Sequence, residues 1–273
     1  LSDLNELAVI TGGPFSIAEN AASGTVVGQV QATDEDTWAV LTYVLSSTTS
    51  PEGMFSIDSG TGDITLIEPL DYETASSYTL TITVFDGGNQ PVPPTHQVVV
   101  NVTNVNEAPQ ATGGSFSMRE DAVPNPPVER FRVVGTDQDA GQTLSYAIVG
   151  GNTNGKFTIN TSTGQIYLAA TLSYETDPVY NLQVRVTDNG NPALSTTVVV
   201  TANIIDVNEA PVVAGGTYSA PENSLIGRPT GGATGVEFDI GQTLTYEIIS
   251  GNTGGAFTIN SATGAVSVAG PLD

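Results

Sequence analysis

Residues 78–84 read Tyr-Thr-Leu-Thr-Ile-Thr-Val, and this stretch decides the fold class. Apolar side chains alternate with hydroxyl side chains at a period of two, which is the pattern of a β-strand with one buried face. Residues 98–102, Val-Val-Val-Asn-Val, have the same β-branched character. We therefore predict a core built from these side chains: Tyr43, Phe55, Ile57, Tyr78, Leu80, Ile82 and Val84.

Similar short runs surround this strand, and clusters of turn residues separate them. Residues 59–62 (Ser-Gly-Thr-Gly) and 161–164 (Thr-Ser-Thr-Gly) are such clusters and favour hairpins. Seven short strands separated by turns are typical of a Greek-key β-sandwich, and no stretch suits an amphipathic helix longer than about two turns. The strands are predicted near residues 14–18, 25–33, 41–46, 54–58, 63–67, 77–85 and 95–103.

The whole pattern occurs three times along the chain. The pair Asn-Glu begins at residues 5, 106 and 208, so the period is 101 and then 102 residues. We predict three tandem all-β units over residues 1–107, 108–209 and 210–273, and we expect the chain to be a piece of a longer array. The third unit lacks its last strands, which leaves disorder, proteolytic trimming or completion by another chain open.

Composition excludes several classes of function. Six Lys and Arg stand against 29 Asp and Glu, with a net charge of −23, so the chain has no basic track for nucleic-acid phosphates. The absence of Cys excludes disulfides, thiolate metal sites and thiol catalysis. No apolar run approaches the roughly 18 residues that span a bilayer, so we expect any anchor to lie outside this sequence. The natural partners of so acidic a surface are cations.

The recurring acids lie at strand ends and at the seams between units, not along solvent-facing strand surfaces. Glu19 follows the first predicted strand, and Asp86 and Asp188 end the sixth strands of their units. Asp71 and Glu73 are two residues apart, so both project to the same side of an extended segment. This placement predicts clusters of carboxylates at the seams.

These motifs resemble those of tandem cadherin repeats of the type common in bacterial surface proteins. The resemblance rests on Glu-Asn at residues 19 and 222, on the Asp-x-Asp loops, on Leu-Asp-Tyr-Glu at 70–73 and on Asp-Val-Asn-Glu-Ala-Pro at 206–211. It covers essentially the whole chain. It implies cadherin/immunoglobulin-like sandwiches, an extracellular or cell-surface location, and calcium at each junction between repeats.

The resemblance also implies which residues bind the metal. Between units one and two, at junction one, the implied ligands are Glu19, Asp71, Glu73, Asn106, Glu107, Asp137, Asp139 and Asp188, helped by the carbonyls of Val105 and Ala108. Between units two and three, at junction two, they are Glu120, Glu175, Asn208, Glu209, Glu237 and Asp239. Near the N-terminus, half a junction is formed by Asn5, Asp34, Asp36 and Asp86.

The charges at junction one favour calcium on independent grounds. Seven of its eight implied ligands are carboxylates, and at about 5 Å and an effective dielectric constant near 20 each like-charged pair costs roughly 3 kcal/mol. Calcium accepts about 6–8 oxygen ligands with tolerant geometry, whereas magnesium demands an octahedron and keeps its waters. Two or three Ca²⁺ ions would offset most of this charge.

Junction two departs from the pattern. Ser173 replaces an expected Asp, Glu237 replaces an Asp with a longer arm, and the strand-end Asp would fall beyond residue 273. We therefore expect junction one to bind calcium more tightly. The linker Asn-Glu-Ala-Pro is one residue shorter than the commonest animal form, so the carbonyl ligands stay open.

Catalysis is not expected. His96, the only His, has no counterpart in the other units, which favours a strand-edge or loop role. A glycosidase would use one pair of carboxylates, whereas these acids recur at each junction. Residues 137–148 approach the EF-hand pattern, but Ile148 stands where a Glu is required.

The sequence thus predicts a calcium-rigidified extracellular stalk or adhesin segment, which projects a binding domain or adheres to other copies of itself between cells. Extracellular calcium modules bind at about 10⁻⁴–10⁻³ M, so such sites are loaded outside a cell. The alternative is a module that binds polysaccharide at the cell surface. Its mark would be an exposed aromatic platform, for which Trp38 is a weak candidate.

Overall fold

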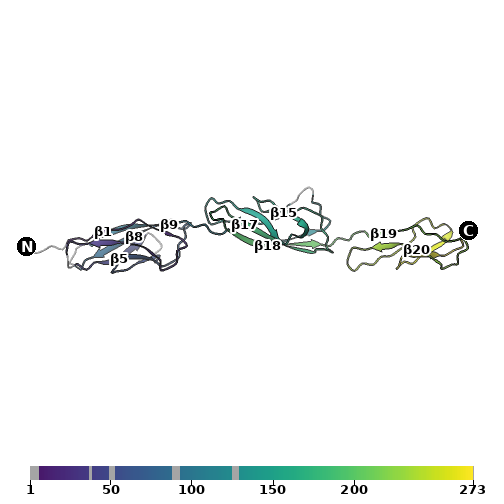
Figure 1. Ribbon diagram of the computed structural model, residues 1–273, viewed down its shortest axis with the longest axis horizontal. Coiled ribbons are helices and arrows are strands. Elements are labelled where there is room, and N and C mark those ends of the chain that lie inside the picture. Colours follow the sequence, from purple (N-terminus) through teal and green to yellow (C-terminus); the bar gives the residue numbers. More distant parts are fainter. Residues whose placement is uncertain (1–5, 37–38, 49–52, 88–92, 125–128, 273) are drawn as a thin grey trace, which may run out of the picture. The chain divides into compact units, whose positions relative to one another are not determined.

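The computed structural model describes residues 6–36, 39–48, 53–87, 93–124 and 129–272. Within these ranges the chain is all β, and its helical segments are two short 3₁₀ turns, η1 (Thr153–Gly155) and η2 (Thr253–Gly255). The strands form tandem β-sandwiches, as the sequence predicts (Figure 1).

The first sandwich consists of a four-stranded sheet and a three-stranded sheet. The larger sheet has the order β2-β9-β8-β5, with β2 (Phe15–Ala18), β9 (Thr95–Thr103), β8 (Ser77–Phe85) and β5 (Thr42–Thr48). The smaller has the order β3-β7-β6, with β3 (Val26–Gln29), β7 (Asp63–Leu66) and β6 (Phe55–Ile57). Strand β2 is parallel to β9, and the other pairs are antiparallel.

The core of this sandwich confirms the predicted face of β8. Its four alternating apolar residues, from Tyr78 to Val84, are at most 3% exposed. Tyr43 and Phe55 are buried beside them, and Ile57 is half-buried against the same cluster. The rings of Phe55 and Tyr78 meet edge to face with centroids 5.3 Å apart.

Two features of the first sandwich differ from the prediction. Strand β1 (Val9–Thr11) has no counterpart among the predicted strands and pairs with β4 (Gln31–Thr33). The run predicted as one strand over 25–33 is divided between β3 and β4, which belong to different sheets. Val30 lies between them, fully buried, and its N–H donates to the carbonyl of Gly62 at 2.9 Å. The chain therefore changes sheets around a core side chain that the alternation alone does not reveal.

The second sandwich repeats this topology. Its four-stranded sheet is β11-β18-β17-β14, with β11 (Gly114–Arg119), β18 (Ser195–Ile205), β17 (Val179–Thr187) and β14 (Ser145–Gly150). Its three-stranded sheet is β12-β16-β15, with β12 (Glu129–Arg132), β16 (Gln165–Leu168) and β15 (Phe157–Ile159). A further pair is formed by β10 (Gln110–Ala111) and β13 (Gly135–Thr136).

The described part of the third repeat contains a subset of the same strands. It keeps the sheet β20-β23-β22, with β20 (Pro229–Gly232), β23 (Ala265–Val268) and β22 (Phe257–Ile259), and the pair β19 (Val212–Ala214) and β21 (Thr234–Val236). Residues 216–221 and 245–250, which correspond to β11 and β14, form no strands, and Tyr218 and Ile249 are exposed. In the second repeat, β11 pairs with β18 and β14 pairs with β17. The described part of the third repeat contains no counterparts of β17 and β18.

The chain divides into two compact units. The first comprises residues 1–110 with the loops 136–144 and 187–195, and the second comprises residues 111–135, 145–186 and 196–273. The first unit thus takes in two loops that belong by sequence to the second repeat. As a result, the acids of junction one lie in the first unit and those of junction two lie in the second. The repeat boundaries at residues 107 and 209 stay predictions.

Candidate metal centres

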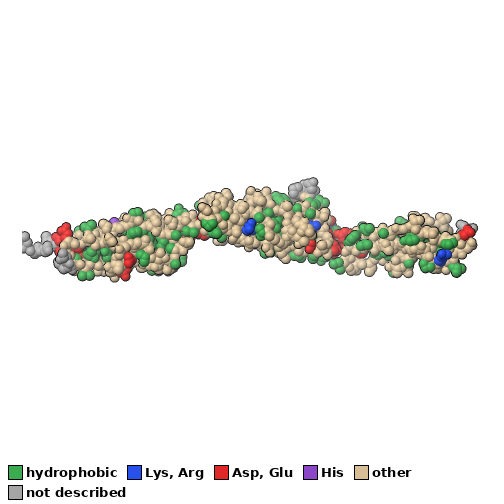
Figure 2. Space-filling model, in the orientation of Figure 1, with side chains coloured by type: hydrophobic (Ala, Val, Ile, Leu, Met, Phe, Trp, Pro, Cys, Tyr) green, Lys and Arg blue, Asp and Glu red, His purple; other side chains and the backbone are tan. Residues whose placement is uncertain are grey.

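Carboxylates converge in four groups of three in the part of the chain that the structure describes, and each junction holds two of these groups. One oxygen from each member lies within 4.8 Å of the others. Glu73 is shared by the two groups of the junction-one cluster, and Glu175 by those of the junction-two cluster. The junction-one cluster consists of Glu19, Asp71, Glu73, Glu107 and Asp139, and the junction-two cluster of Glu120, Glu175, Asp206, Glu209 and Asp239. Figure 2 shows acidic side chains gathered in patches, with few basic ones.

One buried Glu anchors each cluster. Glu19 follows β2 and is 6% exposed, and its carboxylate accepts hydrogen bonds from the backbone N–H groups of Tyr72 and Val105, both at 2.7 Å. Glu120 follows β11 and is held in the same way by two backbone N–H groups at 2.7 and 2.8 Å. Each Glu therefore ties a strand end, a turn and a linker together through one side chain.

The turn at residues 71–74, which Glu19 binds through the Tyr72 amide, supplies two further members of the junction-one cluster, Asp71 and Glu73. Asp71 caps this turn, because its carboxylate accepts hydrogen bonds from the Thr74 hydroxyl at 2.7 Å and from the Thr74 and Glu73 amides. These bonds, the hydroxyl of Thr74 foremost, lower the pKa of Asp71. In the second repeat Ser173 stands in its place, and its hydroxyl donates to Glu175 at 3.1 Å.

The acidic loop of the next repeat holds the linker. Asp139 is buried, and its two oxygens accept hydrogen bonds from the Glu107 amide and from Nδ2 of Asn104, both at 2.9 Å. At junction two, Asp239 accepts from the Glu209 amide at 3.1 Å. Glu107 and Glu209 are thus attached to their clusters in two ways. The backbone N–H donates to a cluster Asp, and the side-chain carboxylate is itself a member of the cluster.

Two further predicted ligands of junction one do not belong to the cluster, but hydrogen bonds hold both of them. Asp137 accepts a hydrogen bond from the Asp139 amide at 3.0 Å. Asp188 is buried and accepts from Nδ2 of Asn106 at 3.0 Å and from the Leu194 amide at 2.9 Å. Burial opposes ionisation of Asp188, but the Leu194 and Asn106 hydrogen bonds outweigh it and lower its pKa.

Burial and mutual repulsion raise the pKa of several cluster acids. Burial, followed by the negative charges of Glu19, Asp139 and Glu73, raises the pKa of Glu107 from 4.5 to about 7. Burial and neighbouring carboxylates likewise raise the pKa of Glu73, Asp206 and Glu209. Full ionisation of either cluster therefore calls for compensating positive charge.

Buried oxygens without a hydrogen-bond partner point to the same need. Glu107 and Asp137 have one such oxygen each at junction one, as do Glu175 and Glu209 at junction two. A buried acceptor that lacks a donor costs about 1–3 kcal/mol, and more when it is charged. A donor set made of carboxylate and amide oxygens suits a hard cation such as calcium, and not ions that prefer nitrogen or sulfur. The residues present therefore fit the predicted ion.

Several predicted ligands do not join the four groups. Asp34 and Asp36 each have a buried oxygen without a partner, and Asp86 is 2% exposed. Glu237 accepts hydrogen bonds from the amides of its own loop at 3.0 and 3.3 Å. The predicted acidic ligands that are described but lie outside the groups are Asp34, Asp36, Asp86, Asp137, Asp188 and Glu237. Asn5 and Trp38 lie outside the described residues.

The sequence analysis quotes Asp206 in the linker motif but does not count it among the implied ligands, whereas the structure groups it with Glu120 and Glu175. Its counterpart 102 residues earlier is Asn104, and Ser173 is in turn the counterpart of Asp71. The two junctions thus exchange one carboxylate between two positions, and each cluster keeps five. A side-by-side comparison of the two linkers, made together with the Asp71/Ser173 difference, would have found it.

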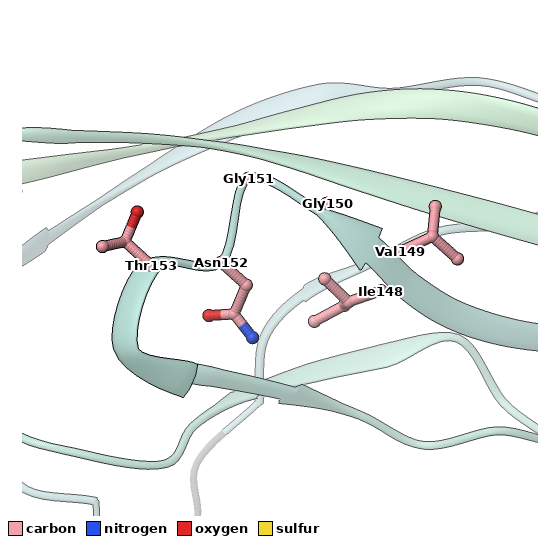
Figure 3. A pocket seen from close by; sticks show the side chains of 6 residues that line it. All are labelled: Ile148, Val149, Gly150, Gly151, Asn152 and Thr153. Atoms are coloured by element: carbon pink, nitrogen blue, oxygen red, sulfur yellow. The ribbon is translucent and has the colours of Figure 1, made fainter.

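Other features add no chemistry to these clusters. A pocket of about 470 Å³ at the end of β14 is lined by residues 148–153, which supply an amide, a hydroxyl and aliphatic groups but no acid or base (Figure 3). His96 lies in β9, and its Nε2 is 3.0 Å from the carbonyl oxygen of Gly12. None of the helical segments in the described ranges is long or apolar enough to traverse a bilayer.

Known proteins show the same architecture. The family model of the cadherin domain matches residues 14–103 and 114–205. The chain belongs to the cadherin family. This cadherin chain is 33% identical over 290 residues to human Protocadherin Fat 1, with 100% of the chain and 6% of that protein covered. It is also 33% identical over 275 residues to mouse Cadherin EGF LAG seven-pass G-type receptor 3, with 94% and 8% covered.

Solved cadherin structures agree with the fold. The structure of mouse Cadherin-23 EC22-24 matches with a TM-score of 0.74 at 26% identity, covering 98% of this cadherin chain and 90% of that one. Protocadherin Gamma B2 extracellular cadherin domains 3-6 match with a TM-score of 0.68 at 26% identity, covering 95% and 63%. The two curated relatives are animal proteins, of which the chain spans less than a tenth. Cadherin repeats are typical of extracellular adhesion ectodomains.

Proposed function

We propose that this cadherin segment binds calcium ions at its two junction clusters and that these ions stiffen the links between successive repeats. The proposal rests above all on two five-carboxylate clusters that contain buried oxygens without hydrogen-bond partners. Carboxylates at such spacing repel one another by roughly 3 kcal/mol per pair at about 5 Å. Divalent cations offset this repulsion and draw the acids together.

Each junction combines its cluster with neighbouring oxygens. At junction one the five cluster acids are joined by Asn106, Asp137 and Asp188, and at junction two by Asn208 and Glu237. Asn5, Asp34, Asp36 and Asp86 form a third, N-terminal ligand set. Bound calcium supplies the positive charge. The chain itself holds the linkers in register, through the backbone hydrogen bonds of Glu19 and Asp139 and of their counterparts Glu120 and Asp239.

The proposed function is calcium-dependent mechanical coupling on a cell surface, in a segment that serves homophilic adhesion between cells or acts as the stalk of an adhesin. Extracellular calcium modules bind at about 10⁻⁴–10⁻³ M, so the junctions fill outside the cell. Without ions, repulsion pushes the acids apart and makes the linkers more flexible. We further propose that the chain is of the cadherin type common in bacterial surface proteins, which the short Asn-Glu-Ala-Pro linker supports.

Small-angle scattering of the chain in millimolar calcium and then in excess chelator tests the mechanical part. We expect the flexibility to rise and the distribution of dimensions to broaden when calcium is removed. Asp139→Ala should produce the same change in calcium, whereas Glu68→Ala, which removes an exposed acid outside the clusters, should not. Identical scattering profiles with and without calcium would show that the ions do not stiffen the chain. Calcium-dependent aggregation of beads coated with the chain tests homophilic adhesion separately.

A further inference from the structure

The carboxamide of Asn106 is closely packed and hydrogen-bonded within the first compact unit. Its Nδ2 donates to Asp188 at 3.0 Å and to the carbonyl of Pro192 at 3.1 Å, and its Oδ1 accepts a hydrogen bond from Nε2 of Gln142. Gly190 lies directly against it, and an added Cβ at this glycine would overlap the same carboxamide. The linker side chain is therefore held by hydrogen bonds and by shape.

The same pair of residues meets in the second compact unit. Nε2 of Gln242 donates to Oδ1 of Asn208 at 2.6 Å. Gln242 and Gln142 occupy equivalent positions, each three residues after the second acid of its loop, and each donates its backbone N–H to the carbonyl of that acid at 3.4 Å. The contact between Gln and the linker Asn is thus found twice, in separate parts of the chain.

The first repeat shows that the equivalent backbone hydrogen bond does not require a glutamine. Ala39 stands at the equivalent position and donates its N–H to the carbonyl of Asp36 at 3.0 Å. Because this backbone hydrogen bond also forms with Ala, we assign the carboxamide of Gln142 a role other than making that bond. Its Oε1 is buried without a hydrogen-bond partner, so the bond to Asn106 is what offsets the burial of this side chain.

We propose that Gln142 and Gln242 are positioning residues that latch the linker Asn to the acidic loop of the following repeat when no cation is bound. This latch is a hydrogen bond between two uncharged carboxamides, so it can hold the linker while the surrounding carboxylates repel one another. It keeps the linker oxygens near the acidic loop, so that the ions complete a junction that is already partly assembled. This inference rests on the proposed role of the junctions, but its test is made without calcium.

Amide hydrogen exchange of the whole chain in excess chelator, followed residue by residue by NMR, tests the latch. The reporter at junction one is the N–H of Glu107, which donates to Asp139 at 2.9 Å, and at junction two it is the N–H of Glu209. Gln142→Met keeps the length of the side chain and removes its N–H donors. We expect exchange at Glu107 to become about two- to twelvefold faster, the range for loss of one neutral hydrogen bond.

The two junctions control for each other. Gln142→Met should leave Glu209 unchanged, and Gln242→Met should accelerate Glu209 and leave Glu107 unchanged. An unaltered rate at Glu107, or equal acceleration at both reporters, would overturn the latch. Failure of calcium to bind would refute the proposed function instead, because the comparison in chelator does not involve the ion.

Discussion

The backbone N–H of Glu107 donates a hydrogen bond to Asp139, whereas the surroundings of its side chain disfavour the ionised carboxylate. Burial and the carboxylates of Glu19, Asp139 and Glu73 raise its pKa to about 7. A raised pKa in the folded state means that the favourable contribution of this group is complete below about pH 4.5. It is then lost as the pH rises through 7. Without cations, the junction-one cluster is therefore weakest at alkaline pH, where calcium has most to offset.

We expect calcium binding to expel this proton. The affinity for calcium should fall as the pH drops from 8 to 6, and binding at pH 6 should release protons into the buffer. Calorimetry in buffers of different ionisation enthalpy measures both effects, and ¹³C shifts of the Glu107 carboxyl in chelator measure its pKa. Equal affinities at pH 6 and pH 8 with no proton release would contradict this assignment.

The exchange of a carboxylate between Asp71/Asn104 and Ser173/Asp206 makes a reciprocal prediction. Asp206→Asn leaves four carboxylates at junction two and should weaken calcium binding there on the order of tenfold, because the number of charged ligands tunes calcium affinity. Asn104→Asp adds a sixth acid at junction one, beside Asp139, and should strengthen binding there. Calorimetry on the two variants, with Glu68→Ala as control, provides the comparison. Loss of affinity in Asn104→Asp would show that residue 104 contributes only its amide.

At the residue scale, the repeated motifs were the most informative part of the sequence. The cadherin resemblance implies that Glu19, Asp71, Glu73, Glu107 and Asp139 share one junction, and the structure brings their carboxylate oxygens together, although their role as metal ligands stays a prediction. Asp206 escaped because Asn104 breaks the motif in the previous linker. The hydrogen bond between Gln142 and Asn106 joins side chains 36 residues apart, and no local pattern encodes it.

At the scale of elements, alternation and turn residues predicted most strands. The hairpin turns at residues 59–62 and 161–164 join β6 to β7 and β15 to β16 as expected. The strand switch at Val30 was not predictable, because a fully buried residue between two short strands continues the apolar pattern of a single strand. Residues 216–221 show that a strand also depends on its neighbour. Their counterpart β11 forms a strand by pairing with β18, but the described part of the third repeat contains no equivalent of β18, and residues 216–221 form no strand.

Two turn glycines of the second repeat give a prediction for the stability of the sandwich itself. Gly164 has φ +71°, and a Cβ there would overlap the carbonyl oxygen of Val133. Gly155 has φ +63° but faces open space. Gly164→Ala should therefore lower the free energy of unfolding by more than the roughly 1–3 kcal/mol of backbone strain alone, whereas Gly155→Ala should cost no more than that strain. Thermal and denaturant unfolding in saturating calcium measures the difference, and equal costs would mean that the turn yields to the added methyl group.

At the scale of the whole molecule, the net charge of −23 should make stability depend on salt much more strongly without calcium than with it. In chelator, raising KCl from about 10 to 500 mM shortens the screening length from roughly 30 Å to a few ångströms, which weakens repulsion within the clusters. We expect the unfolding temperature to rise by about 5 °C, which corresponds to roughly 1 kcal/mol for a domain of this size. In millimolar calcium the ions already neutralise the clusters, and salt competes with them, so the same change should raise the unfolding temperature little or lower it. Differential scanning calorimetry under the four conditions distinguishes the two responses. An unfolding temperature in chelator that ignores salt would show that carboxylate repulsion does not govern the cation-free junctions, and the electrostatic basis of calcium-dependent stiffening would then be wrong.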